Sequence, residues 1–435
     1  MTSAPLRRAA PVVVLVLLAV LSGAGAATAV ARAPAAHDGL VWSADGSLVA
    51  GSVHRGNALA FRGWNARDGS VRWELPISGA KDVEGAPIPE PASIQLSADG
   101  NEVLLVSGRG LWFWRAGSPA ARHLKLEGET ELGDAPRLSP SGGKVAFVRG
   151  EDVAALDVES GTATRLTDDG TDAGARNAAA DERLRGEHPL LELPALLWAP
   201  SSRALLFLRE EPAPAGSTSF PLRLGVADLA WQAVRLLDLG APETGTPVRA
   251  TWRSDSRAVA VERLSPDRTR LDLLLCQTER GRCVALCAHP RAADDPLVDS
   301  FRFFGSSFVW SRVEGGVRGL FEYDGFGREI GRLLPDAWSL TGVAGFDLER
   351  GTVAVRAVAT RGPGRGDAVV ISVPLRSGVP RVLARGDDEA VFAPAGGAWV
   401  HGWHDAHGRF HRQLVSPSGE VLRELSPTSG SEPGG

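Results

Sequence analysis

A short strand–turn sequence motif recurs along this chain and limits the folds that the chain can adopt. Clear copies begin at Trp42, Leu96 and Leu138, and looser copies begin at Trp198 and Trp252. In each copy an apolar residue precedes a cluster of serine, proline, aspartate or glycine, and a short apolar run follows soon after. Such clusters supply the hydrogen bonds and dihedral freedom of a tight turn, and such runs are typical of buried strands. Near-periodic repetition of one supersecondary unit predicts a repeat architecture.

The spacing of this strand–turn motif predicts the size of the repeating unit. Its turn residues fall at 45, 99, 141, 201 and 255, so each unit is 42 to 60 residues long. Such a unit can hold four short antiparallel strands, which make one blade of a β-propeller. After residue 255 the turn residues are less regular, but apolar runs of strand length continue. We predict an all-β, eight-bladed β-propeller of four-stranded antiparallel blades that begin near residues 40, 94, 136, 195, 249, 300, 342 and 391.

One segment departs from the all-β pattern. Residues 177–185 read Asn-Ala-Ala-Ala-Asp-Glu-Arg-Leu-Arg, a composition that favours a helix. We predict a short helical insertion there, between blades three and four. The propeller is expected to span residues 40–425, and the Ser/Pro/Gly-rich tail at 426–435 is expected to be disordered.

The N-terminal segment, residues 1–31, has the features of a secretory signal peptide. Arg7 and Arg8 precede an apolar run at 11–21, and residues 29–31 fit the small-residue cleavage pattern. No charge occurs between Arg8 and Arg32, so an uncleaved membrane anchor is the alternative. We expect an exported protein, periplasmic or extracellular, that contacts a membrane only if this segment is retained.

The charge balance excludes one class of partner. The chain has 47 Lys+Arg against 52 Asp+Glu, a formal net charge of −5, with the two signs interspersed. Binding to nucleic acid needs a basic patch or stripe that neutralises phosphates. Nucleic acid is therefore not expected as a partner.

All three cysteines lie within one predicted hairpin. If its loop is Glu279-Arg280, Cys276 and Cys283 are directly opposed and close enough for a disulfide. An exported protein meets oxidising conditions in which such a bridge persists, and Cys287 would then be unpaired. The alternative is three small core residues without a bridge, because free cysteine is often buried. The spacings fit no paired Cys-x-x-Cys pattern, so we expect no zinc site.

Four histidines, His401, His404, His407 and His411, crowd the last predicted blade. Imidazole is a frequent metal ligand. However, a hairpin that turns at residues 405–408 puts His401 and His411 on different faces and leaves at most His404 and His411 together. We predict solvated or edge-strand histidines, with no metal site and no cofactor.

Three stretches of this sequence resemble a known family, the dipeptidyl peptidase IV family of the prolyl oligopeptidase clan. They are residues 138–170, with a similar turn, strand and Leu-Thr ending; residues 308–325, with a Trp-bearing strand before an Asp-Gly turn; and residues 338–353, with a similar Trp, Asp and Gly-x-Val spacing. The resemblance is to the family's N-terminal eight-bladed propeller and covers about residues 40–425.

The resemblance also bears on catalysis. Family peptidases follow the propeller with an α/β-hydrolase domain that carries its nucleophile in a Gly-x-Ser-x-Gly motif. This sequence contains no such motif, and only about ten residues follow the last predicted blade. We therefore expect that the chain by itself is not a peptidase and has no catalytic residues.

In the family, a pair of glutamates on a helical insertion binds the free amino terminus of the substrate. The insertion here keeps Asn177 and Asp181 at the family's spacing, but Arg185 and Gly186 stand where the glutamate pair is expected. The resemblance leaves Asp181, Glu182 and Glu187 as candidates for holding an ammonium group. The alternative is a solvated helix surface on which Glu182 lies near Arg185.

These observations favour an exported, non-catalytic propeller that binds or scaffolds a protein or peptide in the envelope or outside the cell. The first alternative is the regulatory half of a split serine-type dipeptidyl peptidase, whose hydrolase domain is a separate chain. A second alternative is a truncated gene product without a selected role. The sequence does not separate these three interpretations.

Overall fold

The computed structural model divides the chain into two units, Met1–Arg32 and Ala33–Gly435. The described residues all lie in the second unit, and they are 39–108, 110–125, 134–170, 175–178, 182–213, 220–347, 350–362, 364–376, 378–385, 389–394, 397–405 and 407–425. The predicted signal peptide at 1–31 and the predicted tail at 426–435 lie outside them.

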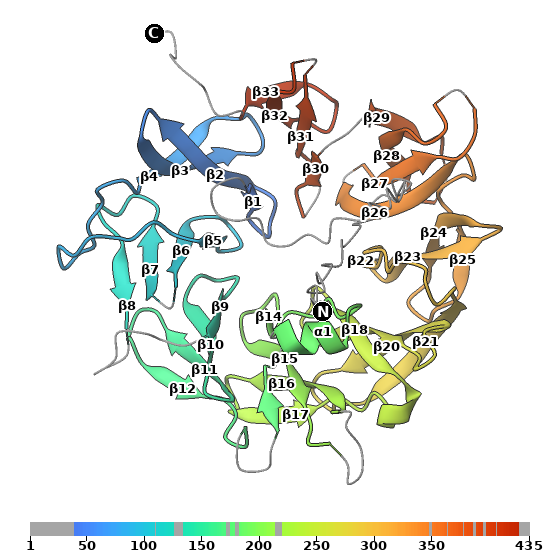
Figure 1. The fold of residues 1–435 in the computed structure, drawn as a ribbon, viewed down its shortest axis with the longest axis horizontal. Coiled ribbons are helices and arrows are strands. Elements are labelled where there is room, and N and C mark those ends of the chain that lie inside the picture. Colours follow the sequence, from blue (N-terminus) through green and yellow to red (C-terminus); the bar gives the residue numbers. More distant parts are fainter. Residues whose placement is uncertain are drawn as a thin grey trace, which may run out of the picture. The chain divides into compact units, whose positions relative to one another are not determined.

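Eight antiparallel sheets follow one another along the described residues and surround a common centre (Figure 1). Seven sheets have four strands and one has five, and each is built from consecutive strands of the chain. This arrangement confirms the predicted eight-bladed β-propeller. The first strands of the blades begin at residues 41, 93, 134, 196, 246, 302, 338 and 389, each within a few residues of its predicted start.

The strands of each blade run in chain order from the centre of the ring outward. Blades 1 and 2 contain β1 (Val41–Trp42), β2 (Leu48–Arg55), β3 (Ala58–Asn65), β4 (Val71–Pro76), β5 (Ser93–Leu96), β6 (Glu102–Ser107), β7 (Gly110–Arg115) and β8 (Arg122–Leu124). Blades 3 and 4 contain β9 (Asp134–Leu138), β10 (Lys144–Arg149), β11 (Asp152–Asp157), β12 (Ala163–Arg165), β13 (Arg176–Asn177), β14 (Leu196–Trp198), β15 (Ala204–Glu210), β16 (Leu222–Asp228) and β17 (Ala233–Leu236).

The second half of the ring continues the same order. Blades 5 and 6 contain β18 (Thr246–Trp252), β19 (Ala258–Leu264), β20 (Arg270–Gln277), β21 (Cys283–Pro290), β22 (Arg302–Phe304), β23 (Ser307–Glu314), β24 (Val317–Tyr323) and β25 (Glu329–Arg332). Blades 7 and 8 contain β26 (Trp338–Asp347), β27 (Thr352–Ala359), β28 (Ala368–Pro374), β29 (Arg381–Arg385), β30 (Glu389–Phe392), β31 (Trp399–His404), β32 (Phe410–Val415) and β33 (Val421–Glu424).

The recurring strand–turn motif forms the turn between the first and second strands of a blade. In blade 1 the Ser43 hydroxyl donates to Asp45 at 2.7 Å and accepts the N–H of Leu48 at 3.0 Å, while Gly46 takes a φ of 71°. Blade 2 repeats the serine–aspartate contact, and its glycine has the same φ. A positive φ costs glycine little because it has no Cβ, so the sequence pattern follows directly from the turn geometry.

The same turns also connect neighbouring blades. Four hydrogen bonds join the turns of blades 1 to 5 in succession: Asp45 N to Ala98 O (2.9 Å), Ala98 N to Pro140 O (2.6 Å), Ser141 N to Ser202 Oγ (2.9 Å) and Ser201 N to Ser256 Oγ (3.0 Å). The strand–turn motif therefore has two roles: it connects the first two strands of a blade, and it fixes that blade to the next.

Buried side chains between the blades complete the ring. Tryptophans pack here: Trp198 Nε1 donates to Arg137 O of blade 3 at 2.9 Å, and Trp252 Nε1 donates to Leu197 O of blade 4 at 3.1 Å. Blade 8 meets blade 1 through one apolar cluster of Val49, Trp64, Ala66, Ala398, Val400, Leu414 and Leu425. Arg423 also donates to Gly69 O across this joint, at 2.6 Å.

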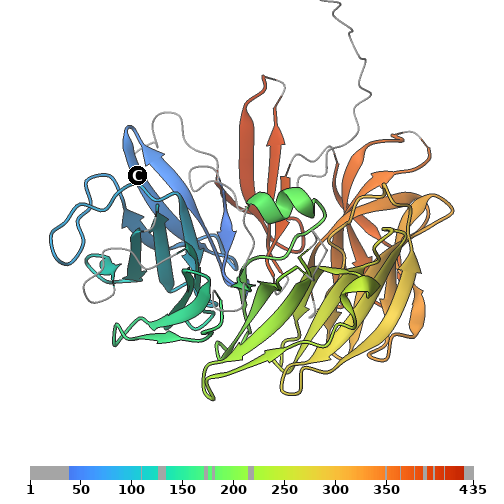
Figure 2. The same cartoon turned by 60° about the horizontal axis from the view of Figure 1, so that its bottom comes forward.

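The helix α1 (Glu182–Glu187) lies between β12 and β14, which confirms the predicted insertion between blades 3 and 4. Figure 2 shows α1 above the strands of blade 4. The short strand β13 precedes α1 and pairs with the end of β15, which makes blade 4 the five-stranded sheet. A single 3-10 turn, Pro242–Thr244, precedes blade 5. Among the described residues, no helix is long and apolar enough to cross a bilayer.

The last hairpin differs from the predicted one by a single residue. The structure pairs Trp403 with His411, so the turn holds residues 405–409. A shift of one residue moves the side chains of a strand to the other face. The predicted separation of His401 from His411 is therefore wrong: the rings of His401, Trp403 and His411 stack on one face, with successive centroids 5.0 and 5.3 Å apart.

Asp405 accounts for the longer turn. Its carboxylate accepts the backbone N–H groups of His407 at 2.8 Å and Arg409 at 2.9 Å, and it lies 3.0 Å from Nε2 of His411. These contacts hold a five-residue loop where the sequence predicted four residues. In the described part of the chain, no group of three or more histidine, cysteine, aspartate or glutamate side chains could hold a metal ion.

Candidate binding site at the insertion between blades 3 and 4

The insertion is fixed to blade 4 by strand pairing. Arg176 lies opposite Glu210 and Asn177 lies opposite Arg209, so β13 extends the inner side of the blade beyond β14. Two residues make a very short strand, so backbone pairing alone gives β13 little stability. The side chains of these four residues provide the further contacts that hold the insertion.

Glu210 is the centre of the first set of contacts. Its side chain is 2% exposed, and its carboxylate accepts hydrogen bonds from Arg176 Nη1 at 3.0 Å and from Arg183 Nη2 at 2.8 and 2.6 Å. Arg183 belongs to α1, and its Nη1 also donates to Glu187 at 2.9 Å. The hydrogen bonds that Arg183 donates to Glu210 and Glu187 raise its pKa above the ordinary value. A buried carboxylate needs such partners, and here two guanidinium groups supply them.

Asn177 is the centre of the second set and is 1% exposed. Its Nδ2 donates to Asp152 at 3.2 Å and to Asp169 at 3.0 Å, and its Oδ1 accepts from Arg209 Nη1 at 3.0 Å. Arg209 also donates to Asp169 at 2.7 Å. Asp152 and Asp169 belong to blade 3 and the segment after it, so this amide connects two blades through the insertion.

Both aspartates stay charged in this network. Burial by itself raises the pKa of Asp152, but hydrogen bonds from Arg165, Thr167 and Asn177 outweigh it and the pKa is lowered. At Asp169 burial is again opposed by hydrogen bonds from Asn177 and Arg209, and the pKa is lowered. The site therefore consists of paired charges of both signs.

Of the three candidate ligands that the sequence named for an ammonium group, Glu187 is the one whose side chain is described. Asp181 lies outside the described residues, and Glu182 begins α1 with a side chain that is not described. Glu187 ends α1, is exposed, and contacts the guanidinium of Arg183. The carboxylate of Glu187 thus faces a cation of its own helix.

Glu210 is the central residue of these contacts, and sequence reasoning missed it. It stands at the end of a buried strand and is followed by a second acidic residue, Glu211. Its partners Arg176 and Arg183 lie 34 and 27 residues earlier in the chain. The only signal in the sequence is the charged run 209–211 directly after five apolar residues, and it does not identify the partners.

A pocket of about 230 Å³ adjoins the C-terminal end of α1. One wall is the segment 187–191, and the other comes from blade 5, in order Thr246, Val248, Leu264, Ser265, Pro266 and Arg268. Prolines, leucines and a valine supply its apolar surface, while Glu187 and Arg268 give it one charge of each sign. Ligand pockets are usually about 300–1,000 Å³. This pocket is smaller than that range.

His188 lies in the wall of this pocket and adds a polar group. Burial lowers its pKa, and the neighbouring carboxylate of Glu187 opposes that effect without reversing it. The imidazole is therefore neutral near pH 7, so that it can donate one hydrogen bond and accept another. The pocket offers apolar contact together with hydrogen bonds and the guanidinium of Arg268.

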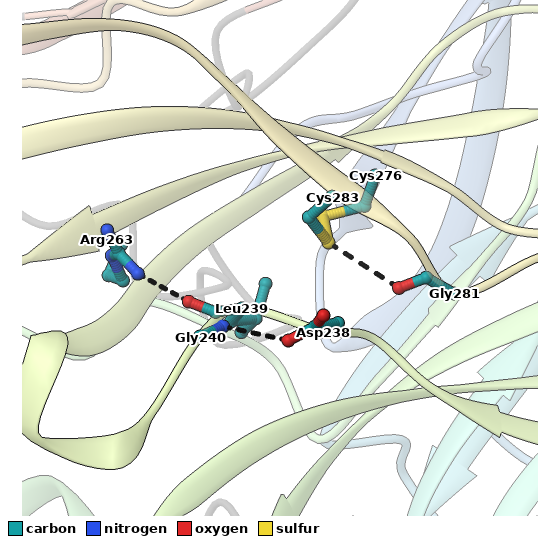
Figure 3. Close-up of a disulfide and its surroundings, with 7 residues drawn as sticks. All are labelled: Asp238, Leu239, Gly240, Arg263, Cys276, Gly281 and Cys283. Carbon is teal, nitrogen blue, oxygen red and sulfur yellow. Dashed lines mark hydrogen bonds between the residues drawn. A yellow bond between two sulfur atoms is a disulfide. The ribbon is translucent and has the colours of Figure 1, made fainter.

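The predicted cysteine hairpin is present in blade 5. Cys276 and Cys283 are directly opposed in the ladder between β20 and β21, as the sequence predicted. They are joined by a disulfide with an S–S distance of 2.04 Å. Figure 3 shows this bridge beside residues 238–240, which follow the outermost strand of blade 4. The disulfide therefore lies at the joint between blades 4 and 5.

Cys287 is the free cysteine of the described residues and is partly buried. It packs with the aromatic cluster between blades 5 and 6, which includes Phe308 and Tyr323. Burial raises the pKa of its thiol to about 12. The thiolate is the reactive form of cysteine, so Cys287 is an inert core residue at neutral pH.

Comparison with known proteins gives the same picture of the fold. The family model for the dipeptidyl peptidase IV (DPP IV) N-terminal region matches residues 121–214 and 212–405. The structure of Porphyromonas gingivalis dipeptidyl peptidase 4 is similar with a TM-score of 0.71 and 17% identity, over 90% of this chain and 60% of that one. A Bacteroides ovatus protein assigned as a dipeptidyl aminopeptidase IV is similar with a TM-score of 0.67 and 12% identity, over 89% of this chain and 59% of that one.

The matches cover different shares of this chain and of the proteins compared with it. The two structural likenesses establish the fold, and this chain spans about 60% of the length of the proteins concerned. The family model covers well over half of the chain, from blade 2 to blade 8. Together with the eight consecutive blades and the helical insertion, it shows that this chain belongs to the dipeptidyl peptidase IV N-terminal region family.

Proposed function

We propose that this chain is an exported, non-catalytic propeller that binds a protein or peptide partner in the envelope or outside the cell. The observation that supports the proposal is that the buried carboxylate at the insertion is already paired with guanidinium groups. Glu210 is enclosed by the guanidinium groups of Arg176 and Arg183, and Glu187 contacts Arg183 as well. Carboxylates paired in this way are poor ligands for a further cation, which supports a partner other than a free amino terminus.

The pocket beside α1 is the proposed contact for that partner. It combines an apolar wall with the exposed guanidinium of Arg268 and the neutral imidazole of His188. A peptide side chain with a nearby acidic group or backbone carbonyl suits this chemistry. Loops that carry such residues on a rigid ring are common binding surfaces.

Activity is the first test of the non-catalytic role. The purified chain is incubated with a chromogenic Xaa-Pro substrate, alone and with an extract of the host. We expect no release of chromophore by the pure chain. Release by the pure chain, at a rate that follows its concentration through a final chromatography step, would contradict the proposal.

Partner capture is the second test. Wild type is compared with Arg268→Glu in cross-linking pull-downs from the envelope fraction, and Arg203→Glu serves as the matched control because Arg203 is also exposed but lies in the turn before β15. We expect a partner that is retained by wild type and the control and lost from Arg268→Glu. Equal recovery by all three would rule out the pocket as the contact.

The second candidate function is the regulatory half of a split dipeptidyl peptidase. It is favoured by the coverage of the two solved structures, which this chain matches over only 60% and 59% of their length. In that case Xaa-Pro cleavage appears only when a separately encoded hydrolase co-purifies with the chain. A partner without hydrolase activity would favour the binding module instead.

A further inference from the structure

A second surface of the ring, between blades 5 and 6, has features of a binding site that do not depend on the insertion. It is a cavity of about 620 Å³, here named the blade 5–6 groove. Its apolar wall is formed by side chains from both blades: Leu275, Leu286, Phe303, Phe308 and Phe326. Its volume lies within the range of about 300–1,000 Å³ that is usual for ligand sites.

The turn of blade 6 gives the groove an exposed aromatic edge. Phe326 is 81% exposed, although it is a large apolar residue. Gly327 holds this turn against blade 5 with a φ of 83°, and a Cβ at Gly327 would lie only 2.3 Å from the carbonyl oxygen of Leu286. The backbone approach that glycine allows therefore places Phe326 beside β21.

The outermost strand of blade 5 is unlike the outermost strands of the other blades. β21 has eight residues and no charged side chain, whereas β4, β8, β12, β17, β25, β29 and β33 have three to six residues and each carries at least one charge. Short length and charge are the usual means of keeping an edge strand from pairing with another chain. β21 is neither short nor charged, although it has a register shift near Leu286 and ends in Pro290.

β21 is exposed at Val284 and is held in place by its neighbours. Val284 is 50% exposed, and within the described residues the strand pairs only with β20, apart from one bridge between Asp238 and Arg282 at its start. The disulfide from Cys276 fixes its first residue to β20. A shift in register near Leu286 brings both Leu286 and Cys287 against the blade 6 cluster. The strand is thus a rigid edge beside an apolar cavity.

Charge decides which kind of segment suits this edge. Arg280 and Arg282 are both exposed at the N-terminal end of β21. At the groove itself the charges are already paired, because Arg253 contacts Asp255 at 2.8 Å and Arg328 contacts Asp324 at 2.8 Å. An acidic residue is therefore favoured at the Arg280 end of a bound segment, and apolar residues are favoured along the rest.

We propose that β21 and the blade 5–6 groove bind an extended apolar peptide segment of a partner protein, with an acidic residue at one end. The segment adds a strand to the free edge of β21 and inserts one large apolar side chain into the groove beside Phe303 and Phe326. Main-chain hydrogen bonds supply affinity in this mode of binding, and the side-chain pocket supplies specificity.

Peptide binding to the intact chain tests the proposal. The probe is a fluorescein-labelled heptapeptide, Asp-Glu-Val-Phe-Val-Val-Thr, and two variants in which serine replaces phenylalanine or lysines replace the two acidic residues. We expect anisotropy to report a Kd of roughly 10–500 µM for the first peptide. We expect each peptide variant to bind at least fivefold more weakly.

Two pairs of protein variants locate the site. Val284→Glu puts a charge on the edge of β21, and Val421→Glu is its control because Val421 is 53% exposed at the start of the outermost strand of blade 8. Phe326→Ser empties the edge of the groove, and Trp231→Ser is its control because Trp231 is 82% exposed in the corresponding turn of blade 4. We expect at least tenfold weaker binding for the first member of each pair and a change of less than twofold for each control.

Several outcomes would overturn the proposal. They are no binding of any of the three peptides, or binding that Val284→Glu and Phe326→Ser leave unchanged. Sedimentation that shows a dimer lost in Val284→Glu would assign the edge to a second copy of this chain. Binding to vesicles of anionic phospholipid that is lost in Phe326→Ser would assign the groove to a lipid surface. Neither a dimer nor vesicle binding is expected.

Discussion

The hydroxyl of Ser202 accepts the backbone N–H of Ser141 at 2.9 Å, although Ser202 itself holds a positive φ of 58°. Ser256 repeats this relationship with Ser201 at a φ of 61°. In the first three copies of the turn the same position is a glycine, with φ between 71° and 72°. The two serines thus combine an unfavourable backbone conformation with a hydrogen bond to the preceding blade.

Ser202 variants should separate these two effects. Ser202→Ala keeps the positive φ and loses the hydrogen bond, which should lower the free energy of unfolding by about 1 kcal/mol. Ser202→Gly also loses the bond but relieves the backbone, a gain of about 1–2 kcal/mol, and should be close to wild type or slightly more stable. Urea unfolding of the three proteins measures the difference. If the alanine variant is as stable as the glycine variant, the backbone at Ser202 is not strained.

Glu210→Gln should release the insertion from blade 4. The change removes the charge that Arg176 and Arg183 share, and hydrogen bonds to charged groups contribute about 1.5–3 kcal/mol. We expect a loss of roughly 2 kcal/mol in unfolding free energy and faster hydrogen exchange in residues 182–187. Glu187→Gln is the matched control because that side chain is 46% exposed, and it should change stability by less than about 0.5 kcal/mol. Equal effects of the two changes would contradict the central place of Glu210.

The disulfide between Cys276 and Cys283 can be tested by counting the free cysteines. Alkylation of the denatured protein should modify one cysteine without reductant and three with it, as measured by mass spectrometry. Closing so short a loop stabilises the fold by about 2.5 kcal/mol in the chain-entropy model, so reduction should lower the Tm. The double variant Cys276→Ser/Cys283→Ser should show no further change on reduction. Three modified cysteines without reductant would show that the bridge does not form.

Acid should destabilise the propeller between about pH 4 and pH 2. Hydrogen bonds from Ser160, Ser265 and His411 respectively, as the largest causes, lower the pKa values of Asp157, Asp267 and Asp405 to about 2. Because each pKa is lower in the folded state than its ordinary value of 3.8, the unfolded chain binds more protons in this range. The stabilisation is therefore present above pH 4 and is lost as pH falls towards 2.

The check on this prediction is the urea midpoint measured from pH 7 to pH 2. The triple variant Asp157→Asn/Asp267→Asn/Asp405→Asn should have a flatter dependence on pH than wild type below pH 4. At pH 7 the triple variant should be the less stable of the two, because it lacks the charged acceptors. Parallel curves for the two proteins would exclude these turns as the source of acid sensitivity.

The blades could be predicted from the sequence because residues that are adjacent in the chain determine the geometry of each turn. Ser43, Asp45 and Gly46 form one hydrogen-bonded unit, so their spacing reports the turn and the strands on both sides. The opposed register of Cys276 and Cys283 followed in the same way from a short loop. Local chemistry fixed these features, and local chemistry can be read from one sequence.

Contacts between distant segments could not be predicted in this way. The partners of Glu210 depend on how β13 pairs with β15, which no local pattern specifies. The face of His401 depended on one extra residue in the loop at Asp405, because strand side chains alternate with a period of two. The uncharged edge of β21 is visible in the sequence, but its meaning requires the knowledge that this strand is outermost.

The ring is closed without exchange of strands, since blade 1 consists of β1 to β4 and blade 8 of β30 to β33. Among the described residues, an apolar cluster and the contact of Arg423 with Gly69 O join the two blades. In the part of the chain that the structure describes, separating them would expose apolar surface but would break no ladder of backbone hydrogen bonds. Closure of the ring at this junction therefore depends on side-chain contacts and not on a shared sheet.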